Sequence, residues 1–201
     1  EVFRNLGGGR FQARSVADGY GYWMGLAGGD IDEDGDQDLF FSNLGNSLPD
    51  ALTEGDLRED QRLEPEWLLL RNDGGFAMTD ITEEKALTGF GFAWGAAFED
   101  IDLDGRLDLL VAQNYIKWPI HKLFKLDGKA FIQWPKGFFH VEELGISNGD
   151  FGQSPLFGDL DGDARPDVVW LNMDGPLRAF LNRSEGNFLS VAMPKGPKTM
   201  G

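Results

Sequence analysis

The feature that most constrains this chain is an acidic segment of ten residues that occurs three times. The copies begin at Asp30, Asp100 and Asp159, and each has aspartate at positions 1, 3, 5 and 9 and an apolar residue at position 10. Successive copies start 70 and 59 residues apart. Periods of this size are typical of stacked supersecondary units, so we expect a series of similar units rather than one irregular core.

The sequence around each acidic segment repeats as well. An aromatic and small-residue run precedes it, an apolar run follows it, and two further segments end the unit; in the first unit these are 21–27, 39–41, 70–72 and 76–81. Short apolar runs bounded by Gly, Asn and Asp favour strands over helices. Four short strands per unit, repeated radially, predict an all-β fold, a β-propeller of four-stranded antiparallel blades.

About three and a half blades are expected. The half blade, the three blades and a tail span 1–20, 21–81, 91–144, 151–193 and 194–201. In the second blade the third strand is expected at 123–125, before a turn at Asp127 and Gly128. Such a count does not close a ring, so we expect completion by more of a longer chain, by a second copy or by a larger assembly.

The charge of the chain is concentrated in the acidic segments. They hold 14 of the 34 acidic residues and only Arg106 and Arg165 as basic ones, and so account for −12 of the formal net charge of −16. An acidic surface repels polyanions, which disfavours nucleic-acid binding. The absence of cysteine excludes disulfides, thiolate zinc sites and a cysteine nucleophile. No apolar run approaches the roughly 18 residues of a membrane span.

Carboxylates crowded at alternate positions of a tight loop repel one another unless a cation binds between them. Calcium requires such hard oxygen ligands, whereas Mg²⁺ demands a stricter geometry and keeps its waters. Glycine at position 6, Gly35 and Gly105, permits the sharp turn. The loop is not an EF-hand, because position 12 is Phe41, Val111 or Trp170 rather than Glu.

With these features the sequence resembles the FG-GAP/VCBS repeats of the integrin α-subunit type of β-propeller. The pattern Asp-x-Asp-x-Asp-Gly-x-x-Asp-Leu and the Arg-Asn-x-Gly-Gly turn at 71–75 carry the resemblance, which covers about 1–193. Tyr-Trp-Met-Gly at 22–25 and Ala-Trp-Gly-Ala at 93–96 resemble bacterial repeats found ahead of an ASPIC/UnbV-type module. Residues 187–196 resemble the beginning of that module.

The resemblance implies up to three Ca²⁺, each held by the side chains at positions 1, 3, 5 and 9 and the carbonyl at position 7. The ligands would be Asp30, Asp32, Asp34, Asp38 and the Asp36 carbonyl; Asp100, Asp102, Asp104, Asp108 and the Arg106 carbonyl; and Asp159, Asp161, Asp163, Asp167 and the Arg165 carbonyl. In the third loop Ala164 replaces glycine, Gly162 lies two residues earlier and Pro166 lacks an N–H donor. If position 6 requires a positive φ, alanine costs about 1 kcal/mol there. We therefore expect the third site to be the weakest.

Other regions are candidates for partner contact. The polar, acidic excursion at about 45–66 is either a binding loop or a solvated insertion without a role. Tyr115, Trp118 and Trp134 are candidates for a platform that stacks on a sugar or protein, or else belong to the core. The two histidines, His121 and His140, lie in different expected strands, and no Gly-x-Ser-x-Gly elbow is present, so we expect no enzyme activity.

The function expected from the resemblance is that of a non-catalytic, calcium-binding module for protein interaction or adhesion. Its location would be extracellular, at the cell surface or in the bacterial periplasm, and calcium would rigidify the loop between the first two strands of each blade. Its partners would be proteins or glycans at the cell surface, without nucleic acid and without membrane insertion. The alternatives are a carbohydrate-binding, lectin-like module and a non-catalytic accessory part of a larger secreted enzyme.

Overall fold

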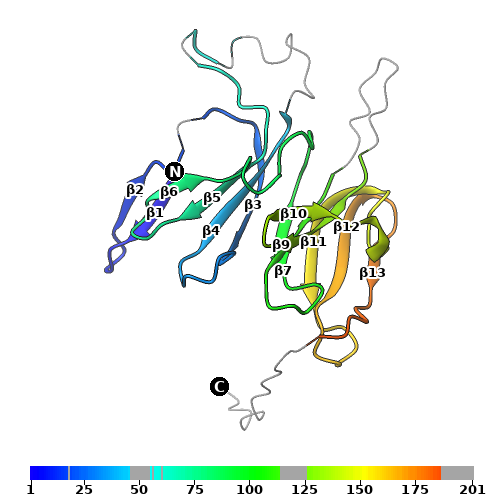
Figure 1. Ribbon diagram of the computed structural model, residues 1–201. Helices are drawn as coiled ribbons and strands as arrows, with labels where there is room; N and C mark the ends of the chain where they lie inside the picture. Colours follow the sequence, from blue (N-terminus) through cyan, green and yellow to red (C-terminus); the bar gives the residue numbers. More distant parts are fainter. Residues whose placement is uncertain (18, 46–54, 56, 60, 114–125, 187–201) are drawn as a thin grey trace, which may run out of the picture.

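The chain forms antiparallel β-sheets that lie side by side (Figure 1). The computed structural model describes residues 1–17, 19–45, 55, 57–59, 61–113 and 126–186. The strands are β1(Val2–Asn5), β2(Phe11–Arg14), β3(Trp23–Gly29), β4(Asp38–Asn43), β5(Leu68–Asn72), β6(Met78–Asp80), β7(Ala96–Glu99), β8(Asp108–Val111), β9(Lys129–Trp134), β10(Gly137–His140), β11(Phe151–Gly158), β12(Asp167–Asp174) and β13(Arg178–Phe180). The described helical residues are those of the 3-10 turn η2(Glu142–Leu144) and Gly45, and no described helix could span a membrane.

Each sheet is a meander in which strands that follow one another in sequence are hydrogen-bonded neighbours. The sheets have the orders β1-β2, β3-β4-β5-β6, β7-β8-β9-β10 and β11-β12-β13. The prediction of an all-β fold made of antiparallel, blade-like sheets is therefore confirmed, and the described sheets do not close into a barrel. A fourth strand of the last sheet was expected near 188–193, which lies outside the described residues.

One strand lies elsewhere than the sequence predicts. In the sheet β7-β8-β9-β10, which corresponds to the second expected blade, the third strand is β9, and it pairs with β8 through Leu109 opposite Phe131. Asp127 and Gly128 thus precede the third strand instead of following it, and the expected position at 123–125 lies outside the described residues. Burial explains the choice, because Ala130, Phe131 and Ile132 of β9 are almost fully inaccessible to solvent.

The sheets pack face to face, and β8 shows how. Leu109 and Val111 belong to a core shared with the preceding sheet, which contributes Phe40 and Leu69. The alternate residues, Leu110 and Ala112, belong to a second core, to which the following sheet contributes Val168 and Trp170. Successive side chains of a strand point to opposite faces, so every residue of β8 is buried between two neighbouring sheets.

The outer face of the last sheet lacks a comparable cover among the described residues. Position 2 of the acidic segment is Ile31 in the first copy and Ile101 in the second, and these side chains are only 4% and 5% exposed because the next sheet covers them. The corresponding Leu160 of the third copy is 54% exposed. Leu156 and Leu171 on the same sheet are exposed as well.

Candidate metal centre

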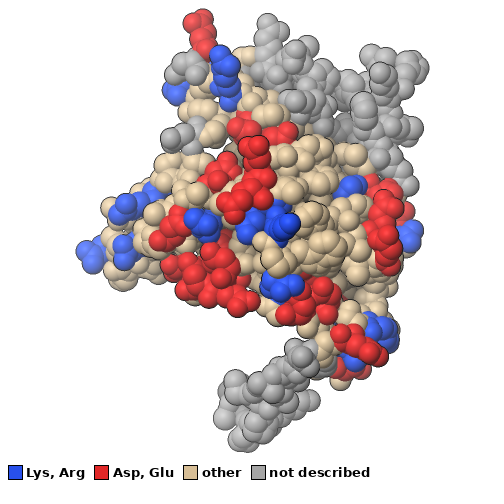
Figure 2. Space-filling model, in the orientation of Figure 1, with Lys and Arg blue, Asp and Glu red and all other residues tan. Residues whose placement is uncertain are grey.

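Each acidic segment forms the loop between the first and second strands of a sheet. The loops, called loops 1, 2 and 3 here, span 30–38, 100–108 and 159–167. The pair that closes each loop is the same in all three, namely Gly29 with Asp38, Glu99 with Asp108, and Gly158 with Asp167. Because the sheets lie side by side with the same orientation, the loops lie along one edge, where acidic side chains gather (Figure 2).

In every loop the structure brings together three of the predicted ligands, the carboxylates at positions 1, 3 and 9. One carboxylate oxygen of each lies within 4.8 Å of the others, in the groups Asp30, Asp32, Asp38; Asp100, Asp102, Asp108; and Asp159, Asp161, Asp167. The donor set is made of carboxylate oxygen alone, without nitrogen or sulfur, which is the chemistry that suits a hard divalent cation such as Ca²⁺. The residues present therefore fit the predicted metal.

The aspartate at position 9 also fastens the loop to the sheet. Asp38, Asp108 and Asp167 are fully buried. One oxygen of each accepts the backbone N–H of position 2, and the other accepts a backbone N–H at or just after the third strand, with distances of 2.7–2.9 Å. The donors at the third strand are Asn72, Gln133 and Asn182. Position 9 is thus a structural anchor as well as a candidate ligand, a role the sequence analysis missed.

The aspartate at position 1 shapes the turn of the loop. In all three copies it accepts the N–H groups of positions 5 and 6 at 2.9–3.1 Å. These bonds hold the backbone around the carboxylates in the same conformation each time. Hydrogen bonds within each acidic loop therefore set its backbone conformation, and a cation would bind to carboxylates that the folded loop already holds close together.

Two residues of each loop adopt left-handed backbone conformations. Position 6 has φ of 94° at Gly35, 96° at Gly105 and 68° at Ala164, as the sequence predicts. Position 4 is left-handed too, with φ of 62° at Glu33, 61° at Leu103 and 84° at Gly162. Each loop therefore contains one glycine and one other residue at these positions, and loop 3 merely exchanges their order.

The aspartate at position 5 stands apart from the other three. Asp34, Asp104 and Asp163 each accept the backbone N–H of position 7 at 2.9–3.0 Å and are not members of the carboxylate groups. In loops 2 and 3 position 7 is arginine, and Arg106 and Arg165 form ion pairs with Asp104 and Asp163 respectively. Two of the position 5 carboxylates thus already have a cationic partner.

Burial raises the pKa of three carboxylates in loops 1 and 2, namely Asp38, Asp102 and Asp108. Loss of solvent around Asp108 raises its pKa from 3.8 to about 7, although the backbone N–H groups of Gln133, Ile101 and Asp102 donate to it and lower the pKa. Burial likewise raises the pKa of Asp38 and of Asp102, and neighbouring loop carboxylates add to the shift. The first two loops therefore carry negative charge that the surrounding protein compensates only in part.

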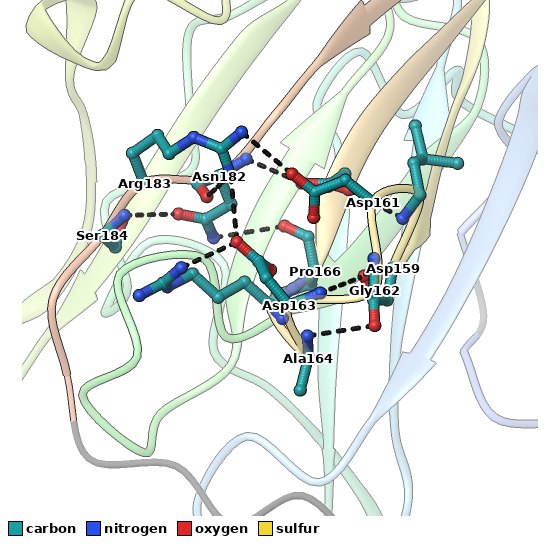
Figure 3. A network of polar contacts seen from close by, with 12 residues as sticks. Asp159, Asp161, Gly162, Asp163, Ala164, Pro166, Asn182, Arg183 and Ser184 are labelled. Atoms are coloured by element: carbon teal, nitrogen blue, oxygen red, sulfur yellow. Dashed lines mark hydrogen bonds and ion pairs between the residues drawn. The ribbon is translucent and has the colours of Figure 1, made fainter.

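A second arginine, which the sequence analysis did not single out, contacts loop 3 from another segment of the chain (Figure 3). Arg183 lies just after β13 and places its guanidinium on Asp161 and Asp163, with both N–O distances 2.9 Å. The neighbouring Asn182 is the residue whose N–H donates to Asp167. Asn72 and Gln133, the residues that correspond to Asn182, are followed by Asp73 and Trp134 instead of arginine. A comparison of the three repeats would therefore have revealed Arg183.

The loops also contact the next sheet. The carbonyl of position 2 accepts a side-chain amide from the third-strand region of that sheet: Gln133 donates to Ile31 at 2.8 Å, and Asn182 donates to Ile101 at 2.8 Å. These bonds join residues more than eighty positions apart. Order in one loop is therefore coupled to the packing between neighbouring sheets.

The remaining candidate residues gather no second site among the described residues. Tyr115, Trp118 and His121 lie outside them, as do 46–54, 56 and 60 of the excursion near 45–66. Trp134 ends β9, is 49% exposed and packs on Phe139 at a ring distance of 5.1 Å. The pKa of His140 is lowered by burial and by the nearby charge of Lys129, and none of its described contacts forms a catalytic arrangement.

Comparison with known proteins supports the repeat assignment. Residues 159–201 match the profile of the FG-GAP-like repeat, a segment that begins at the first aspartate of loop 3. Over 188 residues, 90% of the chain, the sequence is 25% identical to cartilage acidic protein 1 of Xenopus tropicalis. The chain spans 28% of the length of that relative.

Proposed function

We propose that this chain is a calcium-binding β-propeller module that serves protein interaction or adhesion outside the cell, without catalytic activity of its own. The observation that carries the proposal is the threefold recurrence of the carboxylate group at positions 1, 3 and 9, in loops with the same hydrogen bonds. Its similarity to FG-GAP-like repeats supports a role in interaction. The bacterial subtype associated with ASPIC/UnbV modules is part of the proposal and rests on sequence resemblance alone.

Calcium is the cation that best suits the site. Three carboxylates within 4.8 Å repel one another, and partial burial strengthens the repulsion. Calcium accepts about 6 to 8 oxygen ligands in flexible geometry, so further loop oxygens and water would complete the shell. Three ions would change the formal charge of −16 to about −10.

The expected role of calcium is to stabilise the loop edge and, through it, the packing of the sheets. Ile31 and Ile101 lie inside the loops, contribute side chains to the cores between sheets and accept amide bonds from the next sheet. Binding of an ion to the folded loop adds to the stability of the folded state, because the unfolded chain does not gather the ligands. A partner would then meet a rigid edge of loops, which lowers the entropic cost of binding.

The test is calcium binding by calorimetry together with thermal unfolding in calcium and in chelator. Asp32→Asn is the most informative variant, because Asp32 is a group member that makes no hydrogen bond among the described residues. We expect it to weaken one site at least tenfold and to reduce the calcium-dependent rise in Tm. Glu84→Gln removes the same charge from an exposed position outside the three loops and serves as the control. Identical melting of the wild-type protein in calcium and in chelator would refute the proposal.

A further inference from the structure

The three loops differ in the number of positive charges placed on them. Among the described residues, no lysine or arginine forms an ion pair with loop 1, whose position 7 is Asp36; Arg71 is near enough to interact with the charge of Asp32, but its ion pair is with Asp73. Loop 2 has one such pair, between Arg106 and Asp104. Loop 3 has Arg165 on Asp163, and in addition Arg183 on both Asp161 and Asp163.

Arg183 is unlike the other two arginines because it contacts a member of the carboxylate group. Its Nη2 donates to Oδ2 of Asp161, the position 3 carboxylate, at 2.9 Å, while Nη1 donates to Oδ2 of Asp163 at 2.9 Å. The ion pairs of Arg106 and Arg165 are with Asp104 and Asp163, the position 5 carboxylates, which stand outside the group. Arg183 thus holds an oxygen of a candidate calcium ligand with a permanent positive charge.

The backbone on either side of Arg183 is fixed, so its guanidinium does not reach the loop by chance (Figure 3). The Asn182 side chain donates to the carbonyls of Ile101 and Pro166 at 2.8 and 3.1 Å. Its Oδ1 accepts the N–H of Ser184 at 2.8 Å. Since the N–H of Asn182 also donates to Asp167, the chain segment that carries Arg183 is tied to loop 3 itself.

We infer that Arg183 is an internal counter-ion of loop 3 that competes with calcium for Asp161. This inference rests on the proposed function and names a regulation of the third site. When calcium is scarce, the guanidinium neutralises loop 3; when calcium binds, Asp161 must give up or share the arginine, and the two positive charges repel each other. Loop 3 therefore responds to a higher calcium concentration than loops 1 and 2, and the protein has two tight sites and one weaker site.

The test compares Arg183→Gln with Arg178→Gln in the full chain. Arg178 is on the same hairpin and pairs with Asp150, away from the loops, so its loss controls for the removal of a surface arginine. By calorimetry with calcium alone we expect Arg183→Gln to raise the affinity of the weakest site several-fold to about tenfold, and to leave the other two unchanged. In chelator, Arg183→Gln should lower Tm, and added calcium should then raise Tm more than in the wild type.

A double variant assigns the effect to loop 3. Adding Asp161→Asn to Arg183→Gln should abolish the strengthened site and leave two tight ones. If the wild-type protein binds calcium and Arg183→Gln leaves every affinity unchanged, the inference about Arg183 is wrong while the proposed function stands. If neither the wild-type protein nor Arg183→Gln binds calcium, the proposed function itself is wrong.

Discussion

At the scale of single residues, the three loops show that one backbone path is compatible with two glycine placements. The sequence draws attention to Ala164, since glycine is expected at position 6, and its φ of 68° confirms that this position is left-handed. Yet Glu33 and Leu103 are equally left-handed at position 4 of the other loops. A non-glycine residue costs about 1 kcal/mol in either place. Strain at Ala164 therefore gives no reason to rank loop 3 last, whereas the charge of Arg183 does.

The pKa of Asp108 leads to a prediction about pH. With the folded-state pKa raised to about 7 by burial, against an ordinary 3.8, the folded protein binds this proton more tightly than the unfolded chain does. In chelator, the free energy of unfolding should therefore fall as pH rises from about 4 to about 7, and level off above that. Urea unfolding at a series of pH values checks this.

Two controls separate Asp108 from the other acidic groups. Asp108→Asn cannot ionise, so its urea midpoint should depend less steeply on pH than that of the wild type. Saturating calcium should cancel or reverse the dependence in the wild type, because the metal binds the ionised carboxylate. Equal pH slopes for the wild-type protein and Asp108→Asn in chelator would contradict the assignment.

At the scale of elements, each acidic loop combines a carboxylate cluster with an anchor; in loop 1 Asp38 belongs to both, whereas Asp32 belongs to the cluster alone. Asp38 accepts N–H groups from Ile31 and Asn72, whereas Asp32 makes no hydrogen bond among the described residues. In chelator, Asp38→Ala should lower the free energy of unfolding by about 2–5 kcal/mol, because two buried donors lose their acceptor. Asp32→Ala removes the same charge but only relieves repulsion, so it should be neutral or stabilising.

Urea unfolding of the two variants provides the measurement, and calcium provides the check. With calcium present both variants should be less stable than the wild type, because each removes a ligand. Equal destabilisation of Asp32→Ala and Asp38→Ala in chelator would show that position 9 has no anchoring role beyond its charge.

The acidic loops and the strands beside them show how much of the structure can be predicted from the sequence. Spacing and residue type predicted the loops and the strands on either side of them, while the calcium sites in the loops stay a prediction. The anchoring role of position 9 was not predicted from the sequence. Its partners Asn72, Gln133 and Asn182 lie 15 to 34 residues away and become neighbours only through strand pairing. The sequence prediction misplaced β9, the third strand of the sheet β7-β8-β9-β10, for a related reason. The Asp127-Gly128 pair indicates a turn, but it does not show whether the third strand lies before or after that turn. In the structure the third strand is the segment after the turn, where Phe131 is buried against β8.

At the scale of the whole molecule, each sheet depends on its neighbours for burial. β8 is buried on both faces, and the position 2 side chains of loops 1 and 2 are covered by the following sheet. The equivalent positions of the last sheet leave Leu156, Leu160 and Leu171 exposed by 58%, 54% and 39%. The two equivalents of Leu160 in the same chain, Ile31 and Ile101, are buried, so the apolar face around Leu160 is suited to be covered by a further layer. A second copy or another blade of this repeat is the partner that suits such a face.

This face leads to a prediction about association. The 201-residue chain should self-associate at high concentration, with a weight-average mass in sedimentation velocity that rises above 22.3 kDa. Leu156→Asp should abolish the rise without lowering Tm, since a charge at a site with 58% exposure remains solvated in the monomer. Leu177→Asp places the same charge on the nearby hairpin, at a side chain that is 69% exposed and outside the apolar face, and should associate like the wild type.

A buried position provides a second comparison. Ala27 in the sheet β3-β4-β5-β6 corresponds to Leu156 but is buried, so Ala27→Asp should instead lower Tm strongly. A chain that stays monomeric at all concentrations, or that loses association equally in both leucine variants, would contradict a role for this face.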